Sequence, residues 1–76
     1  MTKQVEPVYR AIAIRIEMLR DTLGLSQGEL AKRSGISRPA LANIECGRQR
    51  ISVHQIEAFA EAMSTTPKNL LKGIWF

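Results

Sequence analysis

The sequence predicts an all-α fold, a compact bundle of five short helices. Three observations support this prediction. Apolar residues recur at intervals of three or four positions, which is the spacing of one helix face. The alternation of apolar and polar residues that marks a half-buried strand is absent from the whole sequence. Serine, threonine, proline and glycine residues stand where the ends of such helices need them.

The first helix is expected to start at Pro7, whose missing N–H would be unpaired in the first turn in any case. Gly24 is expected to end it. The second helix is expected to follow Ser26, because Ser26 and Glu29 have the spacing of a capping box, and Gly35 closes it. The apolar stripe of the first helix comprises Val8, Ile12, Ile16, Leu19 and Leu23, widened by Ala11, Ile14 and Met18.

The third helix has two possible caps. Pro39 favours an early helical position but disfavours the helical conformation at the residue before it, so either Ser37 or Arg38 can be the cap. Gly47 is expected to end this helix. The fourth and fifth helices are expected to start at Ser52 and Thr66, respectively.

The length of 76 residues predicts one domain over residues 1–76. The lone Cys46 excludes an internal disulfide, and with His54 it provides too few ligands for a zinc site. We see no nucleophile paired with a base and no phosphate loop, so we predict no catalytic residue, cofactor or metal. There is no room for a domain that senses a small molecule. Without a membrane-length apolar run or a secretion signal, we expect a cytoplasmic protein.

The formal net charge of +4 is concentrated in one stretch of the chain. Residues 32–50 carry five basic side chains and one acidic side chain, whereas the basic and acidic side chains balance in the segments before and after it. A local basic zone in an otherwise neutral chain predicts phosphate binding. Charge alone leaves open the alternative of an ordinary solvated basic face.

The basic zone overlaps two short predicted helices, over residues 26–34 and about 38–46, that a tight turn at Gly35 joins. This is the arrangement of a helix-turn-helix. In that motif the second helix enters the major groove of DNA, and the first helix crosses the backbone. The matching motifs are Leu25-Ser26-Gln27, Glu29-Leu30-Ala31, Ser34-Gly35-Ile36-Ser37 and Ile44-Glu45-Cys46-Gly47-Arg48.

On these motifs the chain resembles the Cro/repressor-type (Xre-like) helix-turn-helix family over about residues 10–72. The resemblance implies a lambda-repressor-like DNA-binding domain with double-stranded DNA as its partner. It also implies an ion pair between Arg20 and Glu45, which ties the first helix to the end of the third. Such a pair fixes orientation more than it adds net stability.

The resemblance also implies which residues meet DNA. Gln27 is expected to contact a phosphate and to brace the recognition helix. Arg38 is expected to bond guanine or a phosphate, and Asn43 to bond adenine, so direct readout rests mainly on these two. The other expected DNA contacts are Ser37, Pro39 and Ala42 in the recognition helix and Arg48, Gln49 and Arg50 after it.

We therefore predict a sequence-specific transcriptional regulator, a repressor rather than an activator, that binds a pseudo-palindromic operator as a homodimer. The candidate dimer contacts are Leu70 and the apolar tail Ile74, Trp75 and Phe76, because large apolar side chains are favoured at interfaces. The alternative is a protein-interaction module, such as the antitoxin of a toxin–antitoxin pair, that binds a partner protein through the same tail. The basic zone favours DNA, since a pure interaction module does not need it.

Overall fold

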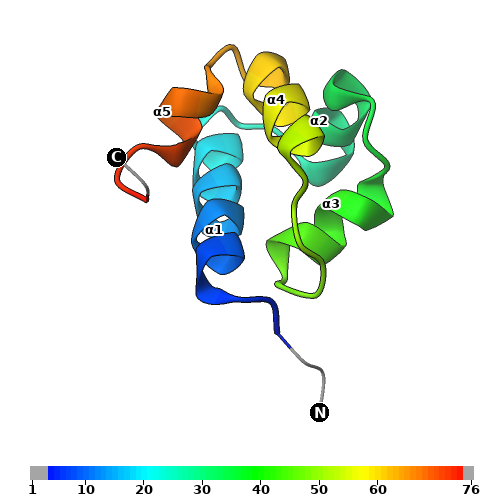
Figure 1. Cartoon of the computed structure of the whole chain (residues 1–76). Helices are drawn as coiled ribbons and strands as arrows, with labels where there is room; N and C mark the ends of the chain where they lie inside the picture. The colour runs from blue at the N-terminus through cyan, green and yellow to red at the C-terminus, as the bar shows by residue number, and fades with distance from the viewer. Residues whose placement is uncertain (1–3, 75–76) are drawn as a thin grey trace.

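The computed structural model describes residues 4–74, and the five predicted helices are all present (Figure 1). They are α1 (Pro7–Thr22), α2 (Gln27–Ser34), α3 (Arg38–Glu45), α4 (Val53–Ala62) and α5 (Pro67–Leu71). No strand occurs between residues 4 and 74, so the all-α prediction is confirmed. None of the helices in this range is long and apolar enough to cross a membrane.

Side-chain caps fix where the helices begin. The Ser26 hydroxyl accepts the Glu29 N–H at 3.0 Å, and the Glu29 carboxylate accepts the Ser26 N–H at 2.9 Å. Ser52 and Gln55 form the same reciprocal pair at the start of α4, at 3.1 and 2.9 Å. Two N–H groups that would otherwise have no partner are thereby satisfied in each helix.

The cap of α3 is Ser37, which settles the alternative that the sequence left open. Its hydroxyl accepts the Ala40 N–H at 3.2 Å, and Arg38 is the first helical residue. The turn before it depends on Gly35, whose φ of 73° lies in the left-handed region that a side chain disfavours. The turn between the two helices of the motif therefore spans only residues 35–37.

All five helices contribute to one core around Phe59, the largest of the fully buried side chains. In Figure 1, α1 runs through the middle of the bundle, with α5 packed on one side and α3 on the other. The fully buried apolar side chains are Ile12, Ile16, Leu30, Leu41, Ile44, Phe59 and Leu70.

The predicted apolar stripe of α1 is narrower in the structure. Ile12 and Ile16 are buried, but Ile14 is 45% exposed and Met18 is 61% exposed. These two positions lie four residues apart on the outer flank of α1, where no other helix covers them. Leu23 is 48% exposed because it is the C-cap of α1 and lies beyond the last helical residue, Thr22.

Candidate nucleic-acid interface

Helix α3 has one face in the core and one face in solvent. Leu41 and Ile44 are at most 1% exposed and anchor the helix, whereas Arg38 and Pro39 are exposed. Figure 1 shows α3 at one edge of the bundle, directly after α2. Its solvent side is therefore open to a large ligand. The remaining predicted DNA-facing residues are exposed at Ser37 and half-buried at Ala42 and Asn43.

A buried ionic contact holds the end of α3. The Arg20 guanidinium of α1 donates to both carboxylate oxygens of Glu45, with Nε–Oε2 at 2.8 Å and Nη2–Oε1 at 3.0 Å. The two side chains are 12% and 3% exposed. The hydrogen bond to Glu45 raises the pKa of Arg20 further, so the Arg20 guanidinium stays charged. Arg20 also donates to the Leu25 carbonyl at 2.8 Å, which extends the contact to the loop before α2.

Two more side chains converge on the same glutamate. Gln27, at the start of α2, donates from Nε2 to Oε1 of Glu45 at 2.9 Å. Arg10 of α1 donates to the backbone carbonyl of Glu45. Three side chains from two helices, α1 and α2, therefore fix the end of α3, and this contact gives Gln27 a bracing role. Its expected phosphate contact stays a prediction.

Burial of Glu45 also changes the surface charge. It is the only acidic residue in the 32–50 zone, and its carboxylate is turned inward onto Arg20 and Gln27. The charged side chains that this zone presents to solvent are therefore all basic. The exposed basic residues are Lys32, Arg33, Arg38, Arg48 and Arg50.

The loop after α3 folds back on the helix. The Asn43 carbonyl accepts the N–H groups of Arg48 and Gln49 at 2.9 and 3.2 Å. Arg48 is exposed and has no ion-pair partner among residues 4–74, whereas Gln49 is half-buried. The loop therefore holds Arg48 next to the recognition helix with its charge open to solvent.

Arg50 differs from Arg48 because it is bound to Glu6, from the segment before α1. The two charge-assisted hydrogen bonds are 2.8 Å (Nε–Oε1) and 2.7 Å (Nη2–Oε2). The Arg50 guanidinium also lies 5.8 Å from the centre of the Tyr9 ring. Sequence reasoning missed this partner, because no local pattern connects residues that lie 44 positions apart.

The structure corrects the expected role of Leu70. Its side chain is 1% exposed and belongs to the core, since α5 packs it against α1 and α4. It is therefore no surface contact. Ile74 is half-buried against the same core, and Trp75 and Phe76 lie outside the described residues. The Arg15 guanidinium donates to the Leu70 carbonyl at 3.3 Å, which ties α5 to α1.

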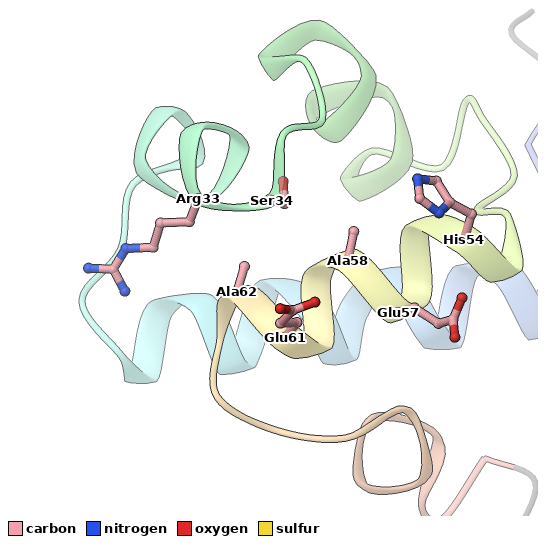
Figure 2. Close-up of a pocket in the computed structure, with 7 residues that line it drawn as sticks. All are labelled: Arg33, Ser34, His54, Glu57, Ala58, Glu61 and Ala62. Carbon is pink, nitrogen blue, oxygen red and sulfur yellow. The ribbon is translucent and has the colours of Figure 1, made fainter.

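A polar groove of about 610 Å³ runs between the end of α2 and α4 (Figure 2). Arg33 of α2 lines it together with Glu57 and Glu61 of α4, so its charges are mixed and it suits phosphate less well than the surface around α3. No group of three or more potential metal ligands occurs among residues 4–74. Sequence reasoning did not single out this groove, because its walls come from two separate helices.

Comparisons with known proteins agree with this geometry. A family model described as a helix-turn-helix domain matches residues 11–71. The restriction-modification controller protein C.AhdI from Aeromonas hydrophila is 32% identical, with a TM-score of 0.78, over 82% of this chain and 94% of that chain. No curated protein matches the chain.

Two further solved structures show the same fold. The wild-type restriction-modification controller protein C.Esp1396I is 16% identical, with a TM-score of 0.85, over 92% of this chain and 91% of that chain. The clp gene regulator ClgR from Corynebacterium glutamicum is 23% identical, with a TM-score of 0.81, over 87% of this chain and 70% of that chain.

Proposed function

Because this chain belongs to the Cro/repressor-type (Xre-like) helix-turn-helix family and is a DNA-binding transcriptional regulator, we propose that it is a sequence-specific repressor that binds its operator as a homodimer. One observation carries the proposal. Helix α3 is fixed from inside by the contacts of Arg10, Arg20 and Gln27 with Glu45, while its outer side and the following loop present basic and polar side chains. A rigid, basic, solvent-facing helix is what reading the major groove requires.

The residues divide by the kind of contact that they are proposed to make. Arg38 bonds O6 and N7 of guanine or a phosphate, and Asn43 bonds N6 and N7 of adenine. Pro39 and Ala42 offer apolar contact to a thymine methyl group. Arg48, Arg50 and the polar Ser37 and Gln49 bind the DNA backbone, which positions the protein without reading sequence.

Dimerisation is supported by the outer flank of α1. Ile14 and Met18 are exposed there, and Arg15 between them holds the end of α5 through its backbone carbonyls. Ile74, which follows α5 and is only half-buried, is the other apolar residue that we assign to the dimer contact. A dimer places two copies of α3 in successive major grooves, so the half-sites lie about 10 base pairs apart. Occupancy of such a site in the cytoplasm represses by excluding polymerase.

Selection of bound sequences from a random pool of DNA duplexes at near-physiological salt tests this function. The proposal expects enrichment of an inverted repeat with half-sites about one helical turn apart. Salt-sensitive binding without an enriched motif would leave DNA contact but refute sequence-specific repression. Absence of binding to any duplex would refute the function and favour the protein-interaction module instead.

A further inference from the structure

We propose that Glu6 competes with DNA phosphate for Arg50, so that the segment before α1 sets how much of the basic surface is available to DNA. This inference rests on the proposed function and deepens it. It assigns residues 4–6 to the DNA interface, although the basic zone and the helix-turn-helix lie elsewhere in the sequence. The ligand class is the phosphodiester backbone.

The segment before α1 lies against the loop that follows the recognition helix. The Val5 N–H donates to the Gly47 carbonyl at 3.0 Å, which fixes the path of the segment. A side chain at Gly47 would collide with the Gln4 amide, so the two stretches are in close contact. A hollow of about 290 Å³ lies between them, lined by Gln4, Val5, Arg48 and Arg50.

This hollow has the chemistry of a phosphate site. Two guanidinium groups line it, and the Gln4 amide adds a donor. The arginine guanidinium forms bidentate hydrogen bonds with phosphate as well as with carboxylate, so two phosphate oxygens can replace the two oxygens of a carboxylate. The proposed function already assigns Arg48 and Arg50, in the loop after α3, to the DNA backbone.

Glu6 occupies the hydrogen-bonding groups of the Arg50 guanidinium. Both Glu6 carboxylate oxygens accept from Arg50, and this hydrogen bonding raises the pKa of Arg50. The pair is nevertheless exposed, with side-chain accessibilities of 61% for Arg50 and 52% for Glu6. Exposed ion pairs are weak and screened by salt, so the polyanionic DNA backbone can displace the carboxylate.

Tyr9 keeps the displaced guanidinium in place. The Arg50 guanidinium lies 5.8 Å from the centre of the Tyr9 ring, within the range of a cation–π contact, and this contact does not involve Glu6. Arg50 can therefore exchange Glu6 for phosphate with little movement. Arg48, in the same loop, has no carboxylate partner among residues 4–74 and is the matched comparison.

The test measures the affinity of Glu6→Gln for a fluorescent mixed-sequence DNA duplex by anisotropy, over about 50 to about 200 mM salt. Glu61→Gln is the control, because it makes the same charge change at an exposed site near the far end of α4 (Figure 2). We expect Glu6→Gln to bind about two- to fivefold more tightly than Glu61→Gln at the low-salt end. The difference should shrink as salt increases.

Two second-site variants make the test specific to Arg50. The gain from Glu6→Gln should disappear in an Arg50→Ala background and persist in an Arg48→Ala background. All four positions are exposed, so thermal unfolding should show folded proteins throughout.

Three results would overturn the competition and leave the proposed function intact. Equal affinities of Glu6→Gln and Glu61→Gln would show that only the net charge matters. A gain in affinity that survives in the Arg50→Ala background would show that Glu6 does not act through Arg50. Weaker binding of Glu6→Gln would show that Glu6 presents Arg50 to DNA instead of withholding it. If the wild-type chain binds no duplex at all, the proposed function fails together with the competition.

Discussion

The Arg20 guanidinium binds both carboxylate oxygens of Glu45 at 2.8 and 3.0 Å, and this contact joins α1 to the end of α3. Gln27 donates to the same carboxylate from the first residue of α2. One glutamate therefore fixes both helices of the motif relative to the rest of the bundle.

Glu45→Ala should destabilise the fold by about 3–5 kcal/mol, because it leaves the Arg20 guanidinium largely buried without its counter-charge. Urea unfolding followed by circular dichroism measures the loss. The double replacement Arg20→Met with Glu45→Leu should recover most of it, since apolar side chains of similar size remove both charges. A loss below about 1 kcal/mol for Glu45→Ala would show that the pair is only a surface contact.

Arg38→Ala and Asn43→Ala should each relax specificity at one base position, at a cost of about 1–3 kcal/mol there. Arg48→Ala should instead weaken binding to all sequences and lower the salt slope by about 1. Affinities for single-base variants of the selected operator distinguish the two behaviours. Uniform loss on every sequence for Arg38→Ala would assign that residue to a phosphate.

Glu29 should make the stability of the fold depend on pH in the acid range. Its pKa is lowered, first by the hydrogen bond from the Ser26 backbone N–H. A carboxylate with a lowered pKa stabilises the folded state above its unfolded pKa, and this stabilisation is lost as pH falls through the folded pKa. Unfolding at a series of pH values should show a steeper acid loss for the wild type than for Glu29→Gln. Parallel curves would contradict this.

Ser64→Gly should stabilise the fold by about 0.5–1 kcal/mol. Ser64 is the second residue after α4 and has a φ of 57°. This conformation costs an L-residue about 1–2 kcal/mol, and the greater flexibility of glycine offsets part of the expected gain. Gly24 has the equivalent place after α1. Its N–H donates to the backbone carbonyl of Asp21, just as the Ser64 N–H donates to the backbone carbonyl of Glu61. Gly24→Ser should therefore lose a similar amount in thermal unfolding. A loss on Ser64→Gly would show that the serine side chain stabilises this turn.

Met18→Glu should weaken self-association if the outer flank of α1 forms the dimer. The side chain is 61% exposed, so the change places a charge in the interface without disturbing the core. Val53→Glu is the matched control, because Val53 is 76% exposed on another helix. Analytical ultracentrifugation measures both. Equal association of the two variants would place the interface elsewhere.

The parts of the fold that the sequence predicts are those that depend on interactions between residues close to one another in the chain. The caps at Ser26, Ser52 and Thr66 and the turn at Gly35 depend on residues within three or four positions, so the pattern alone locates the helices. The basic zone and the helix-turn-helix motifs also lie in one continuous stretch, and the family follows from them. The choice between Ser37 and Arg38 as cap stayed open because Pro39 favours both.

Tertiary structure decides what depends on distant residues. It buries Leu70, exposes Ile14 and Met18, and pairs Arg50 with Glu6. Helical periodicity gives the direction of an apolar side chain but not which neighbouring helix covers it. Ionic attraction, likewise, depends on distances in space that sequence spacing does not encode. The sequence by itself therefore determined the helices, the caps of α2, α4 and α5, and the recognition motif, whereas only packing decided which arginines are free to meet DNA.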